Sequence, residues 1–352
     1  MEDQSEIGYK KNFLEKILDH KALILIIFGI MIRLAMLLYY YWLHIESPGR
    51  SWGDMELYYE SNRISPPLTI FMLDFFRFFS FERIEIFVFW GFFWDILTTL
   101  MFYFVIKSFN IKHANYAFAL FIVNPFFFLN NAFSLENCGY HITDAFFFFF
   151  LFIALFFYPR KQVYSKYLFY IFLALSMCTK YYTIPAVGFF FLKYLIEKDW
   201  YEMKIFILSI LPILILLLIV PIFITDWFLD VLISWKNYGK VPIDLPLFIK
   251  AIPPLIIALL FIFLRLDKSD PFEISIVSTI TTASFMAFSY LYLRWFQSIL
   301  FYGILKEREF TSFNFNLGFI KREIKVTNHL LTFYLSFLAV LFSYLLIIFN
   351  LV

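Results

Sequence analysis

The sequence predicts an all-α protein that crosses a membrane many times. Of its 352 residues, 62% are hydrophobic and only 16% are charged, whereas an ordinary soluble domain has about half and about a quarter. The hydrophobic residues lie in blocks of about 17 to 25, the length that a helix needs to cross the hydrocarbon core of a bilayer. Because a helix satisfies its own backbone hydrogen bonds in lipid and an open strand edge does not, these blocks predict helices.

About eleven apolar segments are expected to span the membrane within a single domain, residues 1–352. Their expected bounds are 22–43, 85–106, 114–130, 142–158, 166–183, 184–197, 204–225, 248–264, 274–292, 295–305 and 328–349. The fifth, sixth and tenth are short for this role. The sequence shows neither an internal repeat nor the Gly-rich helix breaks that mark many transporters.

The positions of the basic residues orient these segments. With a cytoplasmic N-terminus, 19 of the 29 basic residues fall on inner connections and nine on outer ones, while Arg33 lies within a span. This bias predicts that the N-terminus is cytoplasmic and that segments 44–84, 130–144 and 226–247 lie outside. The net charge of +2 and the absence of a Lys/Arg run predict no nucleic-acid partner.

The first outer segment is expected to contain an interfacial helix. Ser65-Pro66-Pro67-Leu68 precedes about a dozen mostly apolar residues that carry Asp74 and Arg77. This stretch is too short and too charged to span, so we expect it to lie along the outer surface.

The same outer segment carries two acids among aromatic residues, in Trp52-Gly53-Asp54-Met55-Glu56-Leu57-Tyr58-Tyr59. Glycosyl transfer needs one carboxylate to take the proton of the acceptor hydroxyl. We expect Asp54 to be this base and Glu56 to contact the acceptor or a divalent metal such as Mg or Mn. Solvated loop acids are the alternative. The sequence does not decide between a strand, which would place both acids on one face, and a helix, which would separate them by about 200°.

Two charged residues lie inside expected spans. Arg33 follows Lys21 by about twelve residues and Asp95 precedes Lys107 by about twelve, so both lie about 18 Å from the cytoplasmic boundary. An unmatched ion at that depth is costly, and we expect a pair. Either a functional role or a structural one, holding the first two spans together, fits this placement.

Polar residues of the second outer segment are expected to line an outward cavity and contact the acceptor. They are Asn130, Glu136, His141 and Asp144, which follow Asn124-Pro125. The alternative is a polar turn between two helices.

Two cations lie at outer ends of apolar blocks, Lys180 in Thr179-Lys180-Tyr181-Tyr182 and Arg294 in Leu293-Arg294-Trp295. We expect them to bind a lipid phosphate, for which guanidinium supplies a planar fork and lysine a point charge. Interface anchors that snorkel to water are the alternative.

These motifs, taken in order, resemble one family. They are Arg33, Asp54-Met55-Glu56, Pro67-Leu68, Asp95 followed by Leu97-Thr98-Thr99-Leu100, Asn124-Pro125, Asp144 and Lys180-Tyr181-Tyr182. The chain resembles the dolichol-phosphate-mannose-dependent mannosyltransferases of the GPI mannosyltransferase I catalytic-subunit family, within the GT-C class, over residues 25–200. The family's Asp-x-Asp is here Asp54-x-Glu56, and its Lys-x-Tyr-Pro is here Lys180-Tyr181-Tyr182 with Pro185 displaced.

The resemblance implies a GT-C-like helical bundle with its active site at the outer or luminal face of the plasma membrane or endoplasmic reticulum. It implies a polyprenyl-phosphate sugar as donor, with mannose as the sugar, a glycolipid or lipid-linked acceptor, and a small membrane subunit as partner. Two other functions stay open. A multi-span transporter of lipid or sugar-lipid predicts repeat symmetry and midplane polar sites, and a non-catalytic membrane subunit predicts that Asp54 is dispensable.

Overall fold

The computed structural model of the chain is helical over most of its described length. It describes residues 20–46, 54–61, 65–109, 142–158, 162–224, 247–287, 309–316 and 321–327, together with positions 115, 118, 119, 122, 160, 330, 334, 338 and 341. The expected spans 114–130, 295–305 and 328–349 lie wholly or largely outside these residues.

The described helices follow the apolar blocks. They are α2 (His20–Glu46), α3 (Asp54–Ser61), α4 (Pro67–Phe78), α5 (Ile84–Ser108), α7 (Ile142–Phe157), α8 (Val163–Thr179), α9 (Pro185–Glu197), α10 (Trp200–Leu214), α11 (Val220–Ile224), α13 (Leu247–Leu264) and α14 (Pro271–Ala287). A π-helical segment, Ile215–Ile219, joins α10 to α11. Short 3₁₀ turns, Tyr181–Thr183 and Leu266–Lys268, follow α8 and α13. A helix is present where the interfacial helix is expected, α4, whose first residue is Pro67. Its position at a membrane surface stays a prediction.

Two of the described helices are long and apolar enough to cross a membrane. They are α5 and the continuous helix Trp200–Ile219. Shorter apolar helices lie at Ile142–Phe157, Val163–Thr179 and Ala251–Leu264. The block expected at 166–183 ends sooner, because Lys180 adopts an extended backbone and Pro185 begins α9.

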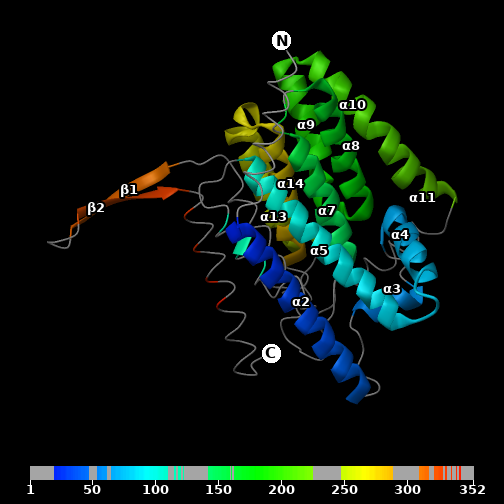
Figure 1. The fold of residues 1–352 in the computed structure, drawn as a ribbon. Coiled ribbons are helices and arrows are strands. Elements are labelled where there is room, and N and C mark those ends of the chain that lie inside the picture. The colour runs from blue at the N-terminus through cyan, green and yellow to red at the C-terminus, as the bar shows by residue number, and fades with distance from the viewer. Residues whose placement is uncertain are drawn as a thin grey trace, which may run out of the picture.

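The helices α7, α8, α9 and α10 run up and down in turn, so that their termini lie at two ends of the bundle (Figure 1). At one end, which we call the α3 end, α7 begins and α8 finishes beside α3 and α4: Thr143 Oγ1 donates to Tyr58 Oη over 3.2 Å and Thr69 Oγ1 donates to the Thr179 carbonyl over 2.6 Å. The opposite end, the α10 end, contains the end of α7 and the start of α8, where the Tyr158 ring packs against Phe169.

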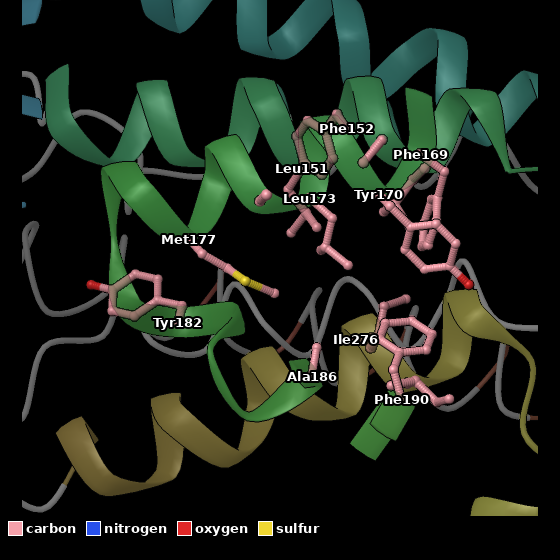
Figure 2. Close-up of a cluster of buried hydrophobic side chains, with 14 of the residues drawn as sticks. Leu151, Phe152, Phe169, Tyr170, Leu173, Met177, Tyr182, Ala186, Phe190 and Ile276 are labelled. Atoms are coloured by element: carbon pink, nitrogen blue, oxygen red, sulfur yellow. The ribbon is translucent and has the colours of Figure 1, made fainter. Parts of the chain in front are cut away.

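The core is built from apolar side chains of α5, α7, α8, α9, α10 and α14. Figure 2 shows Phe152 of α7, Leu173 and Met177 of α8, Phe190 of α9 and Ile276 of α14 converging on one another. The helix α7 is apolar around its whole circumference and packs against both α5 and α8. A helix of this kind belongs inside a bundle or in lipid.

Arg33 and Asp95, which the sequence places at similar depth, form a buried ion pair between α2 and α5. Their side chains are 1% and 7% exposed. Arg33 also donates to the Ile122 carbonyl over 3.0 Å and the Gly29 carbonyl over 3.3 Å. Gly29 allows this close approach, because a Cβ there would lie 2.7 Å from a methyl carbon of Ile122.

A β-hairpin lies where the sequence analysis expected only an inner connection. Strands β1 (Glu309–Asn316) and β2 (Lys321–Thr327) pair in antiparallel register, with Ser312 opposite Lys325 and Asn314 opposite Glu323. The missed signal is the alternation of Phe with Asn in Phe313-Asn314-Phe315-Asn316, a period of two that is typical of a strand. In Figure 1 the hairpin projects away from the helices.

The Arg33–Asp95 pair yields a prediction about stability. Arg33→Met or Asp95→Asn alone should each destabilise the purified protein by about 3–5 kcal/mol, because each leaves an uncompensated partner in the core. The double variant should cost less than the sum by up to about 3 kcal/mol. Thermal unfolding of the four proteins in detergent measures this, and additive losses would show that the two side chains are not coupled.

Candidate functional site

The acidic motif of the first outer segment is helical. Met55 and Tyr58, one turn apart on α3, are 0% and 7% exposed and pack in a cluster with Leu73 of α4 and Phe87 of α5. The neighbouring Tyr59 ring lies 5.5 Å from the Phe87 ring. The aromatic and apolar residues around the two acids therefore attach α3 to the bundle.

The helical conformation of α3 shows that Asp54 and Glu56 do not share a face. Asp54 is the first residue of α3 and Glu56 lies two positions later, so the two positions are about 200° apart around the axis. Glu56 is half-buried, while the side chain of Asp54 lies outside the described part. Two acids on opposite sides of a helix are better suited to separate roles than to binding one ligand together.

Tyr58 ties α3 to two neighbouring helices. Its hydroxyl accepts the 3.2 Å hydrogen bond from Thr143 of α7, and its carbonyl accepts a 2.9 Å hydrogen bond from Arg77 of α4. Arg77 also pairs with Asp74, one turn earlier on α4, at 2.6 Å. Because the bonded hydroxyl fixes the ring and the bonded carbonyl fixes the backbone, α3 is held at Tyr58, in its last turn.

Lys180 and Asp144 form an ion pair directly beside this contact. Asp144 follows Thr143 in the first turn of α7, and Lys180 links α8 to the 3₁₀ turn. Their side chains are 17% and 14% exposed. The ammonium also lies 3.4 Å from Tyr182 Oη and 5.2 Å from the centre of the Tyr182 ring. From the sequence we predict different roles for these two residues, acceptor contact and phosphate contact, and no contact between them.

The structure thus joins several of the expected site residues through a short chain of contacts. It runs from α3 through Tyr58 and Thr143 to Asp144 and Lys180. Sequence reasoning missed Thr143 and the anchoring role of Tyr58. The spacing of Met55 and Tyr58, which marks one helix face, was the available signal.

Other expected site residues are not part of the described chain. Arg294, Asn130, Glu136 and His141 all lie outside it. Among the described side chains, no three of His, Cys, Asp or Glu gather in a way that could hold a metal ion. The expectation of Mg or Mn beside Glu56 stays a prediction.

The Lys180–Asp144 ion pair can bind a ligand if Lys180 exchanges the carboxylate for another anion. Lys180 is neutralised by Asp144, yet both side chains keep contact with solvent. A phosphate that enters here can replace the carboxylate as the ligand of the ammonium, with the Tyr182 hydroxyl close by. The Arg33–Asp95 pair has no such access, since Arg33 is 1% exposed and bonded to two carbonyls.

Comparison of the chain with protein-family models, with curated proteins and with solved structures gives no match. A function of the chain is therefore inferred from its own residues, those of the α3 end.

The attachment of α3 yields a second prediction. Tyr58→Phe keeps the ring and removes the hydrogen bond from Thr143, worth about 0.5–1.5 kcal/mol. Amide hydrogens of α3 should then exchange roughly twofold to tenfold faster, because local opening costs less. Tyr59→Phe is the matched control, since the Tyr59 hydroxyl has no hydrogen bond to a described residue. Equal exchange in the two variants would show that the Thr143 contact does not hold α3.

Proposed function

We propose that the chain is a multi-pass membrane glycosyltransferase that moves a sugar from a polyprenyl-phosphate donor to a lipid-linked or membrane-anchored acceptor. One observation carries the proposal. The acid-bearing helix α3 is hydrogen-bonded to Thr143, and the next residue, Asp144, binds the accessible cation Lys180. A base for the acceptor and a cation for the departing phosphate are the two groups that this reaction needs.

The apolar surface supports the membrane placement. Ile24, Met31 and Leu38 recur every seven residues along α2 and are 65%, 62% and 58% exposed. Leu216 and Phe223, which follow α10, are 65% and 82% exposed. Water-soluble proteins do not leave long apolar faces uncovered, and lipid would cover them. We place the N-terminus in the cytoplasm and the α3 end at the outer or luminal face, as the basic residues indicate.

In the proposed reaction, Asp54 acts as general base. The acceptor hydroxyl oxygen attacks the anomeric carbon of the sugar, and its proton passes to the Asp54 carboxylate. The bond between the anomeric carbon and the phosphate oxygen breaks, and its electron pair leaves with the polyprenyl phosphate. Lys180 and Arg294 stabilise the charge on that phosphate. Mannose is the sugar that the resemblance to the GPI mannosyltransferase I family implies.

A transporter is disfavoured by the geometry of the charges. Transport would use polar groups at the middle of the spans. Arg33 and Asp95 are the charged pair at that depth, but both are buried, and Arg33 is already bonded to Asp95 and to two backbone carbonyls. Lys180 and Asp144, which keep contact with solvent, lie at helix termini instead. A non-catalytic membrane subunit is the remaining alternative, and it is separated by the need for Asp54.

The third prediction tests the general base. Asp54→Asn preserves the shape of the side chain and removes its basic group, so turnover should fall by at least about 100-fold. Donor binding and protein level should stay nearly constant. The measurement is transfer of labelled sugar from a panel of polyprenyl-phosphate sugars to endogenous glycolipid in membranes that contain the protein. Glu60→Gln, which removes an exposed acid of the same helix, should retain activity.

The Glu56→Gln variant is needed to interpret an Asp54→Asn variant that stays active. If Asp54→Asn turns over normally and Glu56→Gln is inactive, the two acids exchange roles. If both variants keep full activity, α3 holds no base and the glycosyltransferase proposal fails.

The fourth prediction concerns the donor phosphate. Lys180→Met and Arg294→Ala should each weaken donor binding about tenfold, a loss of about 1.4 kcal/mol. Arg294→Lys should be tolerated only in part, because the planar fork is lost while the charge remains. Asp144→Asn should strengthen donor binding, because the phosphate no longer displaces a carboxylate from Lys180. Direct titration of the purified protein with the donor measures all four. Tighter binding by Lys180→Met would show that Lys180 does not contact the phosphate.

A further inference from the structure

The α10 end of the bundle contains a pocket that the proposed reaction does not use. It has a volume of about 310 Å³ and is lined by residues from the start of α8, the end of α9 and the start of α10, together with Tyr158, Arg160 and Pro271. This volume is at the small end of the range for ligand sites, suited to a head group or a small metabolite. Tyr170 and Tyr194, whose hydroxyls are hydrogen-bonded to each other, form part of the lining. Figure 2 shows the ring of Tyr170 at the edge of the apolar core.

The charged lining residues are balanced, three cations against three carboxylates. Lys166 pairs with Glu202, and Lys193 pairs with Glu197 at 2.6 Å. Lys193 is further fixed by the carbonyls of Leu266 and Asp267, at 3.4 Å and 3.3 Å. Each pair is therefore neutral in itself. The Lys166–Glu202 pair joins α8 to α10, and the bonds from Lys193 to the two carbonyls join α9 to the turn after α13.

Arg160 and Asp199 are the remaining charges of the pocket, and neither forms an ion pair with a described residue. The guanidinium of Arg160 lies 4.2 Å from the centre of the Phe156 ring and stacks on that ring. This contact leaves the N–H groups of Arg160 able to bind other partners. Asp199 caps α10 by accepting the Glu202 amide over 3.0 Å through Oδ1. A carboxylate has about four acceptor sites, so this bond leaves Asp199 with acceptor capacity.

We propose that this pocket binds a phosphoethanolamine-type zwitterion, with its phosphate on Arg160 and its ammonium on Asp199. A simple anion would meet three carboxylates here, and a simple cation would meet three basic side chains. A ligand that carries both signs is matched at both ends. Guanidinium is the side chain best shaped for phosphate oxygens, and a primary ammonium supplies the N–H donors that a carboxylate and tyrosine hydroxyls accept.

The ligand has two possible sources. If the chain spans the membrane as proposed, the α10 end faces the cytoplasmic leaflet, and phosphatidylethanolamine would supply the head group. A soluble phosphoethanolamine ester would present the same groups from the cytoplasm. The pocket lies at the opposite end of the bundle from α3, so its occupancy is measured without reference to glycosyl transfer.

The test uses the full chain, purified in detergent and stripped of lipid. Native mass spectrometry would compare the binding of phosphatidylethanolamine, phosphatidylcholine and phosphatidylglycerol. Phosphatidylethanolamine should bind about tenfold more tightly than phosphatidylglycerol, which has no ammonium. Phosphatidylcholine should fall between them, because its ammonium has no N–H group. Phosphatidylglycerol that binds as well as phosphatidylethanolamine would overturn the zwitterion assignment.

Two variants place the binding in this pocket. Arg160→Gln and Asp199→Asn should each abolish the tenfold preference for phosphatidylethanolamine over phosphatidylglycerol. Asparagine is also a good helix N-cap, so Asp199→Asn should leave α10 folded. Lys204→Gln and Asp267→Asn remove exposed charges of the same end, outside the pocket, and should keep it. If both pocket variants keep the preference, the lipid binds elsewhere and the proposal is wrong. Should Arg160→Gln fail to fold, Arg160→Lys tests the same contact, with a preference reduced because the planar fork is lost.

Competition by glycerophosphoethanolamine separates the two sources. Displacement of the bound lipid at millimolar concentration would support the zwitterion site and make the soluble ester a ligand. Lipid binding that the ester leaves unchanged would support the site with the leaflet as its source.

Discussion

The structure depends on the packing of α7 between α5 and α8. The side chains of Phe146, Phe147 and Phe152 are fully buried or nearly so on different sides of this helix, and van der Waals contacts of large rings provide much of the cohesion of a core. Because α7 is held along its length, its first turn has a fixed position. Thr143 and Asp144 stand in that turn, so the core positions the contacts to Tyr58 and Lys180.

Charges in the described bundle fall into two classes, and exposure separates them. Arg33 and Asp95 are sealed between helices, where an ion pair mainly prevents the cost of an unmatched charge. Lys180 and Asp144 remain in contact with solvent at a helix terminus. Only a pair of the second class can change partners during a reaction cycle. This distinction depends on the packing around each pair, which spacing along the sequence does not contain.

Sequence patterns predicted the helices better than the site. Apolar blocks and prolines located α4, α5 and α9 closely, because helix length and proline geometry are local properties. The Asp144–Lys180 pair joins residues 36 positions apart, and only the packing of α7 on α8 brings them together. The helical state of α3 is also a tertiary outcome, since eight residues form a stable helix only when one face is buried. The hairpin was missed because the apolar-block criterion ignores a period of two.

The two ends of the bundle differ in how firmly their helices are tied, and this difference bears on where motion can occur. At the α10 end, Lys193 alone binds a carboxylate of α9 and two carbonyls of the turn after α13, and Lys166 joins α8 to α10. At the α3 end, the short helix α3 is held by Tyr58 and a small apolar cluster. Elements with few buried contacts open at the lowest free energy. If substrates enter and leave by movement of a helix, α3 is therefore the element that moves, and it carries the acids with it.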